Sequence, residues 1–283
     1  MNPAATDASR GPVMPSGRPD MAILVNSSDG FRDCWQPFFQ LLQTHWPECR
    51  FPLYLNIEEG SYRHPSLPIR CLNHPADAAG RKVPWSDRLL ASLRAIPERH
   101  VLYMQEDYFL DAPVRDDLVE ESLRLLATEG LGCVHLTHFG SRRGKRVAEL
   151  PHLVDVPRFS HYRVSTQAAI WDKNVLASYV RPDETVWETE ILGTMRSWSN
   201  FAPIRSVEPR RLDGRPIVSY TGTGIIRGKW HPAMQPLFQR HGIDVDFTKR
   251  GFYTFPSRWH TRSRILLSLI RRPRRTLEAL LGL

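Results

Sequence analysis

The sequence predicts an α/β protein with a Rossmann-like sheet, mixed but mostly parallel, flanked by helices. Unbroken apolar runs such as 21–25 and 101–104 are typical of central strands that are buried on both faces. Between these runs apolar residues recur at helical spacing, and such a β-α-β alternation is typical of doubly wound folds. Polar and acidic residues follow the runs directly, at the strand ends where open α/β sheets bind ligands.

The first half of the chain is expected to supply four strands and three helices. A strand over 20–26 leads into a helix over 31–46, where Trp35, Phe39 and Leu42 recur at helical spacing before Pro47. Ser86 is the expected N-cap of the second helix. The remaining elements are strands over 51–56, 69–72 and 101–104 and helices over 84–96 and 116–128.

The second half is expected to continue this pattern up to a glycine-punctuated loop over 221–231. Its elements are strands over 132–137, 162–171, 204–208 and 216–220 and helices over 174–180 and 187–198. We expect a single domain over 20–257. A leader over 1–19, rich in Pro, Ala, Ser and Gly and without an apolar stretch, is expected to be disordered and not a secretory signal.

The composition is that of a soluble globular protein. Of the 283 residues, 41% are hydrophobic and 24% charged, and no apolar run approaches the roughly 18 residues of a membrane-spanning helix. The four cysteines are scattered without a C-x-x-C pair, which argues against a structural zinc site and a disulfide scaffold. A reducing cytoplasm is therefore the expected location.

The net charge of +8 belongs mainly to the tail over 258–283. This tail holds seven arginines and one glutamate, which leaves 31 basic and 29 acidic residues for the rest of the chain. A nucleic-acid-binding domain would spread its Lys and Arg over a folded face, so nucleic acid is not an expected partner.

The adjacent acids Glu106 and Asp107 end the apolar run 101–104. Two neighbouring carboxylates at a strand end are energetically costly to place together unless they hold a metal, a sugar hydroxyl or a cation. The alternative is that they cap the next element or pair with surface arginines. The residues on either side favour the functional interpretation.

Four motifs together resemble bacterial glycosyltransferases of the GT-A type found in surface polysaccharide gene clusters. The motifs are Trp-Ser-Asp-Arg-Leu (85–89), Glu-Asp-Tyr-Phe (106–109), Ser-Thr-Gln-Ala-Ala-Ile-Trp (165–171) and Trp-Glu-Thr-Glu (187–190). The resemblance covers about 21–231. It implies a GT-A-like domain in which a nucleotide-sugar lies across the carboxyl ends of the strands. It also implies that an acidic motif holds a divalent metal and that a later acid acts as general base.

On the donor side, the resemblance assigns roles to six residues. They are Ser27, Asp29, Asp87, Arg88, Glu106 and Asp107. Glu106 and Asp107 lack the spacer of the usual acidic motif, and neighbours at a strand end point to opposite faces, so only one of them is expected to reach a metal directly. We expect this ligand to be Asp107, with Glu106 holding sugar hydroxyls or acting through water. His231 is the expected late ligand, although a lone loop histidine is often simply exposed. Carboxylate oxygens suit Mn²⁺ or Mg²⁺.

On the acceptor side, the expected general base is one of Glu188 and Glu190. The two lie about 200° apart around a helix, so only one can face the site squarely. Acids at a helix start also complement its dipole without any catalytic role. Trp187 offers a surface on which a sugar can stack, and Thr166 and Gln167 offer neutral hydrogen bonds to the acceptor.

The tail alternates short apolar patches with arginine pairs, with Pro273 between them. This pattern suits a basic amphipathic helix on an anionic membrane surface, where each basic residue contributes about 1 kcal/mol. The alternative is a helix that packs its Leu/Ile face on the domain and turns a basic face outward.

The expected function is transfer of a sugar from a nucleotide-sugar to a glycan or lipid-linked acceptor in cell-surface polysaccharide synthesis. The expected cellular location is the cytoplasmic, inner face of the cell membrane, to which the protein binds peripherally. Two other functions compete: a non-catalytic sugar- or nucleotide-binding component of a membrane-associated assembly complex, and a membrane-surface adaptor. An adaptor does not need Glu106, Asp107, Glu188 and Glu190 in one cleft.

Overall fold

The computed structural model describes residues 20–137, 144–148, 150–255 and 273–281. Its centre is an eight-stranded sheet in the order β3-β2-β1-β4-β7-β5-β8-β6. The strands are β1 (Met21–Asn26), β2 (Leu53–Ile57), β3 (Ile69–Asn73), β4 (His100–Gln105), β5 (Cys133–His135), β6 (Leu153–Asp155), β7 (Ala169–Asp172) and β8 (Ile204–Val207). Strand β7 is antiparallel to β4 and β5, and β6 is antiparallel to β8, whereas the other pairings are parallel. The predicted mixed, mostly parallel sheet is confirmed.

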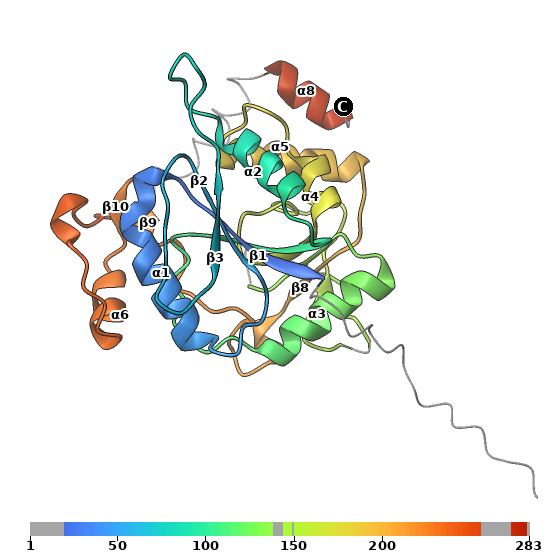
Figure 1. The fold of residues 1–283 in the computed structure, drawn as a ribbon. Helices are drawn as coiled ribbons and strands as arrows, with labels where there is room; N and C mark the ends of the chain where they lie inside the picture. The colour runs from blue at the N-terminus through green and yellow to red at the C-terminus, as the bar shows by residue number, and fades with distance from the viewer. Residues whose placement is uncertain (1–19, 138–143, 149, 256–272, 282–283) are drawn as a thin grey trace, which may run out of the picture.

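Helices flank both faces of this sheet (Figure 1). They are α1 (Arg32–His45), α2 (Trp85–Ala95), α3 (Asp116–Glu129), α4 (Lys173–Tyr179), α5 (Val186–Ser199), α6 (Met234–Arg240) and α8 (Pro273–Leu281), with short 3-10 helices η1 (Asp29–Phe31), η2 (Pro209–Arg211) and η3 (Phe247–Lys249). A small hairpin of β9 (Ile225–Ile226) and β10 (Lys229–Trp230) lies beside the main sheet.

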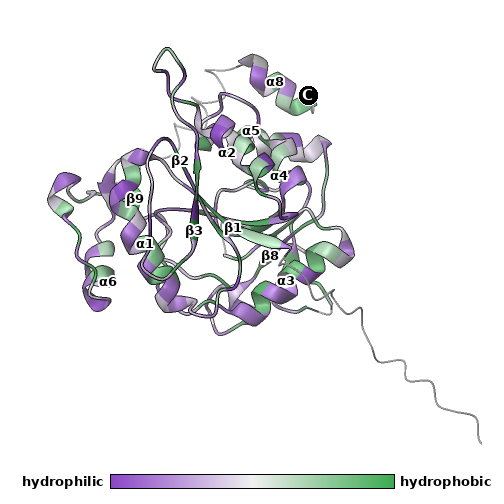
Figure 2. Ribbon diagram, viewed as in Figure 1, coloured by the Kyte–Doolittle hydropathy of each residue, from purple (hydrophilic) through white to green (hydrophobic). Residues whose placement is uncertain are grey.

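Two apolar cores lie on the two faces of the sheet because successive side chains of a strand point to opposite faces. In β4, Leu102 and Met104 join the core under α1 and α3, whereas Val101 and Tyr103 join the core under α2 and α4. Burial on both faces explains the unbroken apolar runs of β1 and β4. Figure 2 shows the same division, with apolar strands inside and helices that carry both apolar and polar residues.

Most predicted elements are present, with ends that differ by no more than two residues. The strand predicted over 162–171 is wrong in its first part, since β7 begins at Ala169. There the buried Arg163 donates to the carbonyls of Val156 (2.8 Å) and Ala202 (2.6 Å). The alternating pattern of this segment therefore reflects the burial of Arg163 and not a strand.

Three further predictions need correction. No strand is described over 216–220, where the N–H groups of Ile217 and Val218 both donate to the Leu136 carbonyl (3.0 and 3.1 Å). Ser86 lies inside α2, whose N-cap is Pro84. The loop predicted over 221–231 contains the hairpin β9–β10. Two further elements, β6 and α6, were not predicted because their sequences have no clear pattern.

Helix α8 is the described part of the predicted basic tail, and 258–272 lies outside the described residues. Within the described residues α8 begins at Pro273, a position at which proline loses no intrahelical hydrogen bond. Within the described ranges, no helix is both long and apolar enough to cross a membrane.

Candidate active site

A cleft of about 730 Å³ opens at one edge of the main sheet. Its walls follow the carboxyl ends of β1 and β4, which are parallel neighbours with Asn26 paired to Gln105. Strand β7 is antiparallel to β4, so its amino end reaches the same edge and brings Thr166 and Gln167 into the cleft. The start of α5 and the hairpin β9–β10 complete the walls. The topology therefore gathers polar side chains from five distant segments.

The acidic pair Glu106–Asp107 lies in the turn after β4 and lines this cleft. Glu106 is 6% exposed and Asp107 is 5% exposed. Burial, followed by the negative charge of Asp107, raises the pKa of Glu106 well above its usual range. Burial also raises the pKa of Asp107, although hydrogen bonds from Thr223 and Ile225 oppose this shift.

Asp107 connects the end of β4 to the hairpin β9–β10. Its Oδ2 accepts hydrogen bonds from the Ile225 N–H (3.0 Å) and the Thr223 hydroxyl. The N–H of Gly224 donates to the Asp107 carbonyl (2.8 Å). A Cβ on Gly224 would collide with the Phe109 ring and lie 2.9 Å from that carbonyl, so this close approach requires glycine. The carboxylate therefore positions the hairpin at the rim of the cleft.

Helix α5 separates the roles of Glu188 and Glu190. The Glu188 carboxylate accepts hydrogen bonds from the N–H (2.9 Å) and hydroxyl (3.0 Å) of Thr185, and Thr185 caps the Glu188 N–H in return. This is a capping box, and Glu188 is not among the residues that line the cleft. Glu190 does line the cleft, is 4% exposed and accepts from the N–H (2.7 Å) and hydroxyl (2.8 Å) of Thr166. Of the two candidate bases, only Glu190 lines the cleft.

Two arginines bring positive charge to the cleft. Arg88 is 5% exposed and donates to the Ser27 carbonyl (2.7 Å), while its Nε has no hydrogen-bond partner among the described residues. Burial lowers the pKa of Arg88, and nearby carboxylates, first Glu58 and then Glu106, oppose this shift. Arg227 lies at the turn of the hairpin β9–β10 with a left-handed φ of 51° and also lines the cleft.

Ser27 lines the cleft, but the predicted donor contacts Asp29 and Asp87 do not. The Asp29 carboxylate accepts from the N–H groups of Glu58 and Glu59, each at 3.3 Å, and fixes the loop after β2. Asp87 accepts from the N–H of Asp183 at 2.7 Å and ties α2 to the loop before α5. Both aspartates hold the backbone of the segments that border the site.

Thr166, Gln167 and Trp187 all line the cleft, as the acceptor assignment requires. The rings of Tyr108 and Tyr220 stack on each other, and their hydroxyl groups hold the Gln167 amide: it donates to the Tyr108 hydroxyl (3.1 Å) and accepts from the Tyr220 hydroxyl (3.0 Å). Trp187 is 65% exposed although it is the largest side-chain type. An exposed indole on a firmly capped helix is a surface that a sugar ring can cover.

The residues of the cleft do not fit a resident divalent cation. Across the described ranges, no three His, Cys, Asp or Glu side chains form a group that could hold one. Asp107 Oδ2 is taken by Thr223 and Ile225, and His231 lies outside the cleft lining with its Nδ1 accepting from the Ala233 N–H at 3.0 Å. The roles of Asp107 and His231 as metal ligands stay predictions that this donor set does not favour.

Several cleft residues were not predicted from the sequence. They are Asn26, Ser28, Phe31, Trp85, Gln105, Tyr108, Thr137, Tyr220, Gly222, Thr223, Ile225, Ile226, Val186, Arg227, Tyr253 and Phe255. The glycine-rich stretch 221–231 was the available signal for the hairpin residues, because glycines cluster where backbones approach closely. Tyr253 and Phe255 follow the last hairpin strand and carried no motif.

A scan of family models and a search of curated proteins both find no match for this chain. Among solved structures, it is similar to Staphylococcus aureus TarS 1–349 in complex with UDP-GlcNAc (11% identity, TM-score 0.49, covering 92% of this chain and 79% of that one). It is also similar to a Mycobacterium tuberculosis glucosyl-3-phosphoglycerate synthase in complex with Mn²⁺ and UDP-glucose (14%, 0.41, 82% and 82%). A third match is a Thermus thermophilus 2-C-methyl-D-erythritol 4-phosphate cytidylyltransferase (13%, 0.42, 78% and 96%). In a longer TarS structure, the match spans 41% of that chain. Glycosyltransferases are thus among the matches, but similarity at this level assigns neither family nor activity.

Proposed function

We propose that this protein is a glycosyltransferase that moves a sugar from a nucleotide-sugar to a glycan or lipid-linked acceptor in cell-surface polysaccharide synthesis. The observation that carries the proposal is the cleft, in which the carboxylate of Glu190 shares one space with two arginines and an exposed tryptophan. A carboxylate suits proton transfer, guanidinium groups suit a diphosphate, and an indole suits a sugar ring. A membrane adaptor has no need of this combination.

The proposed reaction balances without a resident metal. The acceptor oxygen attacks the anomeric carbon of the donor, and the new glycosidic C–O bond forms. The bond from the anomeric carbon to the diphosphate oxygen breaks, and the nucleoside diphosphate leaves with the electron pair. Glu190 takes the proton of the acceptor hydroxyl, and in an inverting transfer it acts on the face opposite the leaving group.

The diphosphate of the donor would lie between Arg88 and Arg227. Charge-assisted hydrogen bonds to phosphate oxygens are about twice as strong as neutral ones, and Arg matches phosphate geometry bidentately. The two charges come from different elements, since Arg88 is on α2 and Arg227 is on the hairpin that Asp107 positions.

Arg227→Ala is expected to weaken nucleotide-sugar binding about tenfold, because one charge-assisted contact contributes roughly 1.5 kcal/mol or more. Lys229→Ala is the matched control: it removes one positive charge from the same hairpin, but Lys229 does not line the cleft. Isothermal titration calorimetry of both variants measures the effect. Equal losses in the two variants would assign it to general charge and not to a diphosphate contact.

The test of the function is a panel of UDP-, GDP-, dTDP- and CMP-sugars screened for binding and for release of the nucleotide. The proposal expects at least one sugar nucleotide to bind more tightly than its free nucleotide and to be hydrolysed slowly without acceptor. Assays with EDTA and with added Mn²⁺ or Mg²⁺ examine the cation prediction in the same experiment. Absence of binding and hydrolysis across the panel would refute the proposal. Binding without turnover would instead favour the non-catalytic binding component.

We also propose that the protein works at the cytoplasmic face of the cell membrane, held by its tail. In α8, Leu277, Leu280 and Leu281 are 58%, 48% and 62% exposed, and their spacing places them on one helix face. Ala279 is buried, and Arg275 turns toward the body of the protein to meet Asp183 (3.3 Å). The exposure of these three leucines is the opposite of what a helix that packs its leucines on the domain requires.

Vesicle flotation tests this location. The full chain is expected to float with vesicles that contain anionic phosphatidylglycerol and to stay in solution with pure phosphatidylcholine. Leu277→Ser combined with Leu281→Ser is expected to reduce flotation severalfold, because these exposed side chains supply apolar area. A matched pair of changes, Gln36→Ser and Gln239→Ser, lies on helices outside the tail and should have no effect. Equal flotation of both double variants would contradict the role of α8.

A further inference from the structure

A second hollow of about 380 Å³ adjoins the cleft. Its wall consists of the start of α2 and the loop that leads into α5. Trp85, Val186 and Trp187 line both spaces, whereas Pro84, Asp183, Glu184 and Thr185 line only the second one. We call the second space the side compartment. The two tryptophans therefore form part of the wall that the two adjoining spaces share, and the proposed base Glu190 lines the larger of these spaces.

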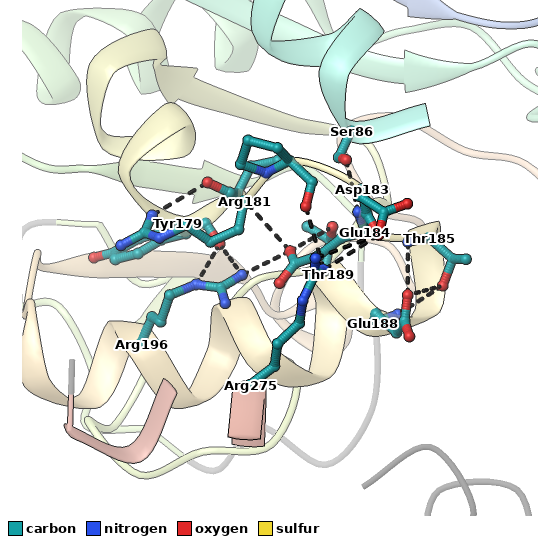
Figure 3. A network of polar contacts seen from close by, with 12 residues as sticks. Ser86, Tyr179, Arg181, Asp183, Glu184, Thr185, Glu188, Thr189, Arg196 and Arg275 are labelled. Carbon is teal, nitrogen blue, oxygen red and sulfur yellow. Dashed lines mark hydrogen bonds and ion pairs between the residues drawn. The ribbon is translucent and has the colours of Figure 1, made fainter. Parts of the chain in front are cut away.

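The floor of the side compartment is a fixed polar network (Figure 3). Glu184 is buried; its N–H donates to the Ser86 hydroxyl (2.8 Å), and its Oε2 accepts from Arg196 (2.8 Å) and Thr189 (3.1 Å). The neighbouring Asp183 holds a left-handed φ of 58°. Such a network, which joins α2 to α5, keeps the compartment open and in one shape without a ligand.

Asp183 is fixed from two sides at the rim. Its N–H donates to Asp87 (2.7 Å) on α2, and its carbonyl and carboxylate meet Arg275 of α8 (3.2 and 3.3 Å). The Asp183 side chain remains 66% exposed. It is therefore an oriented acceptor beside an exposed indole, which is the combination that a sugar needs: an apolar face for the C–H side of the ring and an acceptor for its hydroxyl groups.

We infer that the side compartment binds a second sugar unit of the acceptor, so the acceptor is a glycan of at least two sugars. This inference rests on the proposed function and adds the substrate class. The terminal sugar of the acceptor lies in the cleft near Glu190, and the preceding sugar lies over Trp187 with its hydroxyl groups toward Asp183. The two spaces adjoin and share Trp85, Val186 and Trp187, which favours one ligand that extends over both, a glycan, over a separate small ligand.

The test uses the full chain on an array of defined glycans with one to six sugars, built from hexoses, N-acetylhexosamines and uronic acids. The wild type is expected to bind its best glycan of two or more sugars at least tenfold more tightly than the matching single sugar. Asp183→Gly is expected to abolish most of that preference, because glycine keeps the left-handed backbone but removes the carboxylate. Trp187→Ala, a change at a mostly exposed side chain, is expected to weaken binding of all glycans.

Arg275→Ala is the matched control, since it breaks the same ion pair but leaves the Asp183 carboxylate in place, so the preference for longer glycans should persist. Equal binding of single sugars and longer glycans by the wild type would overturn the inference, as would an unchanged preference in Asp183→Gly. Loss of the preference in Arg275→Ala as well would assign it to the position of α8 and would also overturn the inference. Nucleotide-sugar binding in the same samples reports separately on the proposed function. If donor binds and no glycan does, the side compartment alone is refuted.

Discussion

Glu190→Gln is expected to lower the turnover of sugar transfer by about 10²–10⁴-fold, with little change in donor affinity. Glutamine keeps an acceptor oxygen for the N–H and hydroxyl of Thr166, so the local structure should persist. It cannot take a proton from the acceptor hydroxyl, which is the proposed task of Glu190. Steady-state turnover, compared with donor affinity from calorimetry, separates these effects.

Glu188→Gln is the matched control, two residues away on the same helix. It weakens the capping box with Thr185, so we expect a loss of about 1 kcal/mol or less in unfolding free energy and nearly full turnover. If Glu188→Gln lost turnover and Glu190→Gln kept it, the assignment of the base would be reversed. Full turnover in both would place the base elsewhere or indicate a retaining reaction.

The sequence predicted the strands of the sheet well because burial on both faces leaves a strong pattern. The runs that became β1 and β4 contain only apolar residues over 21–25 and 101–104, and the acids at 106–107 mark the strand end. The segment 162–168 has similar alternation for a different reason, since a buried arginine there holds carbonyl groups of two other loops. The alternation of apolar and polar residues indicates burial, but it does not indicate which groups form hydrogen bonds with the buried polar atoms.

Part of the site was also predictable, because helical spacing is a local pattern. Spacing on a helix indicated that only one of Glu188 and Glu190 could face a cleft. Which of the two does so depends on the capping box that Glu188 forms with Thr185. The partners of Asp107, namely Thr223 and Ile225, lie more than a hundred residues away in sequence, so no local pattern reveals that its carboxylate holds a hairpin. The antiparallel direction of β7, which brings Thr166 and Gln167 to the site, is likewise a property of the whole sheet.

The ion pair between Arg196 and Glu184 is expected to be the most sensitive point for stability near the site. The side chains are 4% and 0% exposed and meet at 2.8 Å, and Arg196 also donates twice to the Tyr179 carbonyl (2.9 and 2.6 Å). Figure 3 shows that these contacts join the end of α4, the loop before α5 and α5 itself. Removing one partner leaves the other charge buried without its counterion, which is far more costly than the loss of an exposed pair.

Arg196→Met is therefore expected to lower the free energy of unfolding by about 3–5 kcal/mol, measured from urea denaturation. Arg124→Met, at an exposed position of α3, is the control and should stay within about 0.5 kcal/mol of the wild type. The double variant Glu184→Gln with Arg196→Met should recover part of the loss, because no charge is then left buried at this pair. A loss below about 1 kcal/mol in Arg196→Met would contradict the argument, since it would mean that water or another cation satisfies Glu184. A large loss with recovery in the double variant would instead establish that buried charge, and not lost side-chain volume, makes this network sensitive.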